Sequence, residues 1–148
     1  MRARRFAILL AIFVGNVACT QAPTVGPAPT FTASVVAIKR PYVPQGPGRP
    51  AAKTGNEWVS VQLQLVNTGS AVRQFSYDDF KLVTADHSRW ESSNLGYGND
   101  PARLGFGQLD PKDTVLGWIM YEVPIGSPAV SVIWSPSPGN QSVTLNLP

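Results

Sequence analysis

The sequence has few of the residues that build catalytic and metal sites. It contains one cysteine and one histidine among 148 residues, and only 14% of its residues are charged. No Cys or His pair is present to hold zinc or copper, and neither a Gly-x-Ser-x-Gly motif nor a glycine-rich phosphate loop occurs. Two acidic pairs, Asp78-Asp79 and Asp110 with Asp113, lack the spacing of a calcium loop and fit turn capping better. We therefore expect no metal, no cofactor and no enzymatic activity.

The apolar run near the N-terminus is too short to cross a membrane. It extends from Phe6 to Val14, about nine residues, whereas a membrane-spanning helix needs roughly twenty. Three arginines precede this run, and the small residues Gly15 and Ala18 follow it. This order predicts a secretory signal peptide over residues 1–18.

The only cysteine, Cys19, lies where a lipid attachment site is expected. The stretch Asn16-Val17-Ala18-Cys19 resembles the lipobox of bacterial lipoproteins, although leucine is usual at the position of Asn16. The alternative is simple secretion after cleavage behind Ala22, which would leave Pro23 next to the scissile bond. A lone cysteine behind a signal core favours acylation, and two or more acyl chains would hold the protein on the membrane.

The net positive charge of the chain comes from the predicted signal peptide. Three of the 12 Lys and Arg residues lie there, which leaves nine against nine Asp and Glu in the mature protein. A mature net charge near zero, with no run of like charge, makes nucleic acid an unfavoured partner.

A proline-rich segment separates Cys19 from the folded domain. Residues 19–29 hold too little apolar content to fold, so we expect a lipidated cysteine and a flexible tether there. Residues 30–148 are expected to form one domain, with a long surface loop from Pro41 to Thr54 between its first and second strands.

The domain shows the period of β-strands. In Trp58–Leu65, Val59, Val61, Leu63 and Leu65 alternate with mostly polar residues, as a half-buried antiparallel strand requires. The absence of a sustained helical period and the regular turn signals predict an all-β, two-sheet antiparallel sandwich. Further strands are expected at Phe31–Lys39, Phe80–Thr84, Leu104–Leu109, Thr114–Val123, Val130–Trp134 and Gln141–Leu147.

Four segments resemble the telokin-like, immunoglobulin-fold domains that are common in bacterial lipoproteins. They are Glu57–Asn67, Asp79–Leu82, Leu109–Asp113 and Gly117–Pro124, and the resemblance covers roughly residues 31–147. It implies an immunoglobulin-like β-sandwich behind a lipid anchor, and it transfers no catalytic residue because each matched position is a core or turn position. Where this family often has glycine in a turn, the chain has Lys112-Asp113, which a type I turn could accept.

The sole histidine, His87, would have to serve any Ser-His-Asp arrangement. Its neighbours Asp86 and Ser88 are adjacent in sequence, so their side chains diverge. We expect a polar turn from Ala85 to Ser88 between two strands. The alternative is a secreted or envelope hydrolase that uses His87.

Aromatic residues supply the candidate binding surface. Strand alternation places Trp58, Trp118 and Met120 opposite the core side chains, where they would form an apolar patch unless the loop at 41–54 covers them. The loop from Ser92 to Gly107, which includes Tyr97 and Phe106, is the favoured contact region because sandwich proteins usually bind through loops.

These patterns predict a lipid-anchored, non-catalytic accessory or binding module. Its partners would be the membrane, through the lipid on Cys19, and an envelope protein or a glycan. We expect it on the extracytoplasmic side of the bacterial cell envelope. Thr20 after Cys19 resembles lipoproteins of the outer membrane, which would be the destination in a cell with two membranes.

Overall fold

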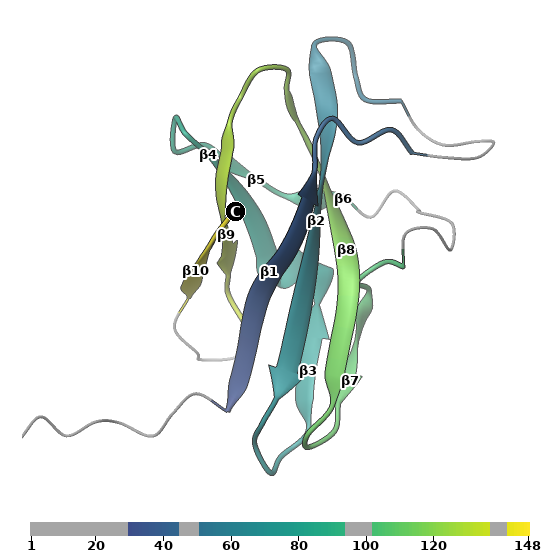
Figure 1. The fold of residues 1–148 in the computed structure, drawn as a ribbon, viewed down its shortest axis with the longest axis vertical. Helices are drawn as coiled ribbons and strands as arrows, with labels where there is room; N and C mark the ends of the chain where they lie inside the picture. The colour runs from purple at the N-terminus through teal and green to yellow at the C-terminus, as the bar shows by residue number, and fades with distance from the viewer. Residues whose placement is uncertain (1–29, 45–50, 94–101, 137–141) are drawn as a thin grey trace, which may run out of the picture.

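The protein folds as an immunoglobulin-like sandwich of antiparallel β-sheets (Figure 1). The structure, a computed structural model, describes residues 30–44, 51–93, 102–136 and 142–148. The expected signal peptide, Cys19 and the tether lie outside the described residues. The strands are β1 (Phe31–Lys39), β2 (Asn56–Asn67), β3 (Arg73–Ser76), β4 (Phe80–Thr84), β5 (Arg89–Trp90), β6 (Ser92–Ser93), β7 (Phe106–Leu109), β8 (Thr114–Pro124), β9 (Ala129–Trp134) and β10 (Val143–Asn146), and a single 3-10 turn, η1 (Tyr77–Asp79), precedes β4.

Two four-stranded sheets form the layers of the sandwich. The first has the order β1-β2-β8-β6 and the second has the order β10-β9-β4-β5. Strands β3 and β7 pair only with each other and form a two-stranded ribbon, which lies near the lower part of β8 in Figure 1. Among the described residues, no helix has the length and apolarity of a membrane span.

The core lies between the two sheets and confirms the alternation predicted for β2. Val59, Val61, Leu63 and Leu65 are all fully buried. On the adjoining strand β8, the antiparallel register places core side chains opposite them, such as Tyr121 opposite Val59. The second sheet contributes Phe80, Leu82, Val132 and Trp134 to the same core.

Most predicted strands are confirmed, with shifts at their ends. β1 and β4 match their expected ranges, β2 is longer at both ends, and β7 begins at Phe106 rather than Leu104. β10 extends over Val143–Asn146, and the Leu147 N–H beyond its end still donates to the Val130 carbonyl oxygen over 3.1 Å; Gln141, where the predicted strand began, lies outside the described residues. The strands β3, β5 and β6 were not predicted.

The turn between β7 and β8 differs from the type I turn that the sequence could accept. The Asp113 N–H donates to the Asp110 carbonyl oxygen over 3.0 Å, and Lys112 has a φ of 74°. A positive φ at the third position of a β-turn, after Pro111, defines type II. Type I was therefore the wrong assignment, because Lys112 adopts a conformation that is usually left to glycine.

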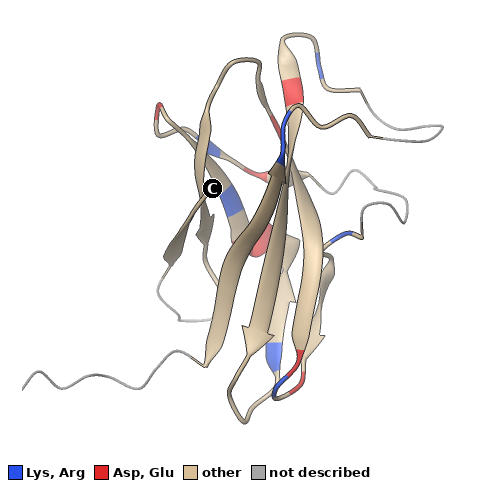
Figure 2. Ribbon diagram, in the orientation of Figure 1, with Lys and Arg blue, Asp and Glu red and all other residues tan. Residues whose placement is uncertain are grey.

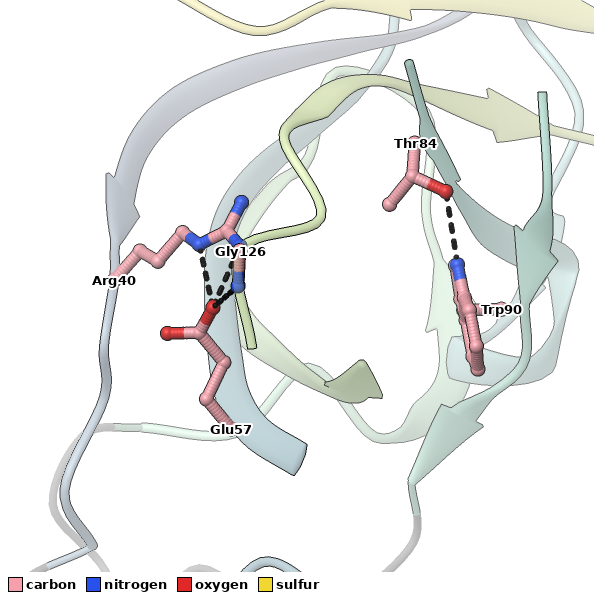
Figure 3. A network of polar contacts seen from close by, with 5 residues as sticks. All are labelled: Arg40, Glu57, Thr84, Trp90 and Gly126. Atoms are coloured by element: carbon pink, nitrogen blue, oxygen red, sulfur yellow. Dashed lines mark hydrogen bonds and ion pairs between the residues drawn. The ribbon is translucent and has the colours of Figure 1, made fainter. Parts of the chain in front are cut away.

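Charged residues of both signs are spread over the described chain (Figure 2). The best-connected pair joins Arg40 to Glu57: Arg40 donates to Glu57 Oε1 through Nε and a terminal nitrogen, over 3.0 and 2.6 Å. The Gly126 N–H points to the same oxygen over 3.4 Å (Figure 3). This carboxylate therefore links the end of β1 and the start of β2 to the turn between β8 and β9.

Candidate functional site

The predicted apolar patch on the first sheet is covered. Trp58 and Met120 lie on the outer face as predicted, yet they are only 3% and 1% exposed. Tyr42 and Ala52 pack against them from the loop between β1 and β2, and the Tyr42 N–H donates to the Trp58 carbonyl oxygen over 2.8 Å. The prediction of an exposed patch at Trp58 and Met120 was therefore wrong. The alternative, that the loop between β1 and β2 covers them, is confirmed.

Trp118 is buried as well, at 8% exposure. The Lys39 ammonium lies 4.6 Å from the centre of its ring. The Trp118 backbone also holds the segment that enters β7, because its N–H donates to Ala102 and its carbonyl oxygen accepts from Leu104, each over 2.9 Å. The adjacent Gly117 permits this approach, since a Cβ atom there would lie 2.5 Å from the Leu104 nitrogen.

Phe106 is the predicted contact residue that the structure exposes. Its side chain is 82% exposed at the start of β7. In the register of the ribbon, Phe106 lies opposite Ser76, and Gln108 lies opposite Gln74. These four side chains share the outward face, because the intervening Phe75 packs inward against the core. Tyr97, the other aromatic residue predicted in this region, lies outside the described residues.

Two open hollows flank the Phe106 ring. The larger has a volume of about 710 Å³ and is lined by the outward face of the ribbon together with Phe75, Gly107 and Asp79. The smaller, of about 370 Å³, is lined by Tyr77, Arg103 and Gly105 and shares Phe106 with the larger one. Both volumes fall within or near the range of small-molecule sites.

The two hollows differ in charge. In the smaller one the Arg103 guanidinium stacks over the Tyr77 ring, with its central carbon 4.5 Å from the ring centre. In the larger one the charged side chain is Asp79, whose Oδ2 accepts a hydrogen bond from the Ser76 N–H over 3.0 Å. Partial burial raises the Asp79 pKa, the Ser76 hydrogen bond opposes the rise, and nearby Asp78 adds to it.

Asp79 also has a structural role at η1. Together with Ser76 it forms a capping box, in which Ser76 Oγ accepts from the Asp78 N–H over 3.3 Å. The predicted capping role is thereby confirmed for Asp79, whereas Asp78 Oδ1 accepts from the Ser92 hydroxyl over 3.3 Å. Within the described ranges, no three His, Cys, Asp or Glu side chains lie close enough together to hold a metal ion.

His87 lies in the hairpin turn between β4 and β5. The Thr84 N–H donates to the Ser88 carbonyl oxygen, and the His87 N–H donates to the Thr84 carbonyl oxygen, so three residues form the loop. His87 is its third residue and has a φ of 66°, as in the usual three-residue hairpin. The predicted polar turn is confirmed.

The groups beside His87 are bonded to one another rather than to its ring. Asp86 Oδ1 accepts from the Thr84 hydroxyl over 2.6 Å, and Asp86 Oδ2 accepts from the Ser88 hydroxyl over 2.9 Å. These hydrogen bonds lower the Asp86 pKa, and the bond from Thr84 has the largest effect. Thr84 Oγ1 also accepts from Trp90 Nε1 over 3.0 Å (Figure 3). In the part of the chain that the structure describes, the His87 imidazole forms no hydrogen bond.

Sequence reasoning located Phe106 but missed its polar neighbours. Gln74 lies on the short strand β3. Because the sequence pattern did not predict β3, it gave no indication that Gln74 lies beside β7. Asp79 was considered as a calcium ligand or a turn cap, not as part of a binding surface. The one usable signal was the alternation of Phe106 and Gln108 about Gly107, which indicates a common face.

The sequence profile of one protein family matches most of the chain. The family is described as "Domain of unknown function (DUF4352)", and the match covers residues 29–143. No curated protein matches the sequence.

Solved bacterial structures share the fold. The predicted lipoprotein YcdA of Bacillus subtilis superposes with a TM-score of 0.62 at 17% identity over 80% of this chain and 36% of YcdA, so the chain spans about a third of that protein. YjhA, also of Bacillus subtilis, superposes with a TM-score of 0.58 at 13% identity over 80% of this chain and 92% of YjhA. The secreted protein MPT63 of Mycobacterium tuberculosis gives 0.54 at 14% identity over 78% of this chain and 82% of MPT63.

Proposed function

The chain belongs to the DUF4352 family of domains of unknown function, and from that premise we propose that it is a lipid-anchored, non-catalytic binding module of the bacterial cell envelope. Its contact surface is centred on Phe106. We also propose that its β-sandwich is of the telokin-like type. A secreted form without lipid is the alternative for its attachment.

The sequence before the domain supports the anchor. A short signal core ends at the only cysteine of the chain, Cys19, and a proline-rich segment follows it. Proteins of similar fold include one predicted lipoprotein and one secreted protein, which agrees with a location outside the cytoplasm.

The exposure of Phe106 is the observation that carries the binding role. A large aromatic ring gains free energy when it leaves water, yet this one is 82% exposed between two hollows. Its strand is fixed on both sides, by pairing with β3 and by the hydrogen bonds between β8 and the segment that precedes it. A preorganised exposed ring of this kind favours recognition of a partner.

The surroundings of His87 support the non-catalytic part of the proposal. A general base must reach both the proton that it abstracts and a group that orients it. Here the carboxylate adjacent in sequence, Asp86, already accepts hydrogen bonds from the Thr84 and Ser88 hydroxyls. We therefore assign this cluster to stabilising the turn. Loss of a hydrolytic activity in His87→Ala would refute that assignment.

Metabolic labelling with radioactive palmitate tests the anchor. We expect the wild-type chain to incorporate label and to partition into detergent, and Cys19→Ser to do neither. Unlabelled wild-type protein in the aqueous phase, or a mature N-terminus at Pro23, would contradict lipidation and favour the secreted form.

Photocrosslinking in cells tests the contact surface. A photoreactive amino acid at Phe106 should give envelope-specific adducts, whereas the same group at Ile125, which is 68% exposed in the turn between β8 and β9, should not. Equal yields from both positions would contradict a contact surface at Phe106.

A further inference from the structure

The larger hollow beside Phe106 combines one apolar surface with several polar groups. The exposed ring offers a flat platform, and the outward polar side chains of the ribbon stand next to it. A ligand that fits both features has an apolar face and a polar edge. The ring of a sugar has this form, because its C–H groups cover one face and its hydroxyls project from the rim.

The amides of Gln74 and Gln108 suit hydroxyl groups. They lie directly opposite each other in the ribbon, and neither side chain has a hydrogen-bond partner among the described residues. Each amide presents two N–H donors and an accepting oxygen. A sugar hydroxyl both donates and accepts, so adjacent hydroxyls can pair with one amide in both directions.

Asp79 adds a stronger acceptor to the same hollow. Its Oδ2 accepts from the Ser76 N–H, while its Oδ1 has no partner among the described residues. An O–H donor paired with a carboxylate forms a shorter and stronger hydrogen bond than a neutral pair does. The unpaired oxygen is therefore a fit for a ligand hydroxyl.

The charge of the lining restricts the class of ligand. Among the described residues that line the larger hollow, none is Lys or Arg, and Asp79 is acidic. An anionic ligand would be repelled there, and a purely apolar ligand would leave the Asp79 oxygen unpaired. Arg103 lines the smaller hollow and is not among the residues that line the larger one.

The geometry points to a subsite for one neutral sugar ring in the larger hollow, stacked on Phe106 and hydrogen-bonded by Gln74, Gln108 and Asp79. This inference deepens the proposed function and rests on it for the location of the surface. A glycan of the envelope would then be the partner of the module.

The test is a binding titration with the full-length chain in a detergent that carries no sugar headgroup. The probes are neutral tetrasaccharides of glucose, mannose, galactose and N-acetylglucosamine, with tetragalacturonate as the anionic comparison. We expect at least one neutral probe to bind. Phe106→Ala should weaken that binding at least tenfold, Asp79→Asn should weaken it several-fold, and the matched control Ile125→Ala should change it less than twofold.

Three outcomes would overturn the inference: no neutral probe binds, only tetragalacturonate binds, or Phe106→Ala binds as tightly as the wild type. Because the Phe106 ring is exposed, the urea midpoint of Phe106→Ala should match that of the wild type, which separates lost binding from lost folding. Crosslinks from Phe106 to an envelope protein, without saccharide binding, would overturn the sugar subsite and leave the proposed function standing.

Discussion

Gly117→Ala should detach the segment that positions Phe106. The added Cβ would lie 2.5 Å from the nitrogen and 2.6 Å from the Cα of Leu104. These are backbone atoms, so no side-chain rotation relieves the contact. The segment must move away from β8, because the strand itself is held by β2 in the centre of the sheet.

The magnitude follows from what this movement breaks. Two hydrogen bonds join Trp118 to Ala102 and Leu104, and each contributes about 0.5 to 1.5 kcal/mol. Leu104 is fully buried, and exposing such a side chain costs about 1.5 to 3 kcal/mol. We expect Gly117→Ala to lower the free energy of unfolding by about 2.5 to 6 kcal/mol.

Urea unfolding of the chain that begins at Thr20 measures this loss. Gly105→Ala is the matched control, because a Cβ atom there meets nothing within 4 Å. It should be neutral or stabilise by up to about 1 kcal/mol, since alanine reduces the entropy of the unfolded chain. A Gly117→Ala value within about 1 kcal/mol of the control would refute the close packing of this segment on β8.

Further predictions concern the core, the turns and pH. Leu63→Ala should cost about 2 to 5 kcal/mol in urea unfolding through lost burial and a cavity, while Gln62→Ala should stay within about 0.5 kcal/mol; equal losses would mean that Gln62 is packed as tightly as Leu63 and would contradict the assigned faces. Lys112→Gly should stabilise by up to about 1 kcal/mol, because glycine adopts the positive φ of the type II turn without strain, and a loss would refute that turn. The pKa of Asp86 in the folded protein lies below its ordinary value of 3.8. The ionised Asp86 side chain therefore stabilises the fold above pH 3.8, and this stabilisation is lost as the pH falls through the lower folded-state pKa. The stability difference between wild type and Asp86→Asn should therefore shrink in acid, and a constant difference in thermal melts would contradict these hydrogen bonds.

The sequence predicted the long strands because burial imposes a period of two on them. Val59 to Leu65 show this period clearly, since one face of β2 meets the second sheet. The strands β5 and β6 contain two residues each, which is too short to display any period. Local pattern could not identify them, and the pairing of β6 depends on β8, which lies far away in the chain.

Side-chain exposure could not be predicted from alternation alone. The pattern correctly placed Trp58 and Met120 on the outer face, but their burial depends on Tyr42, which reaches them from a loop. The turn at Lys112 was missed for a related reason: backbone hydrogen bonds with Asn67, which is distant in sequence, hold a conformation that the residue type disfavours. The site at Phe106 likewise depends on the pairing of β7 with β3, which places Gln74 and Ser76 beside it.

Accessibility of position 106 in the envelope tests the central claim most directly. A maleimide reagent applied to permeabilised cells and to purified protein would report the labelling rates of Phe106→Cys and Ile125→Cys. If the Phe106 surface binds an envelope partner, Phe106→Cys should react more slowly in cells than in purified protein, while Ile125→Cys should react equally in both. Equal rates in cells and in purified protein at both positions would contradict the account.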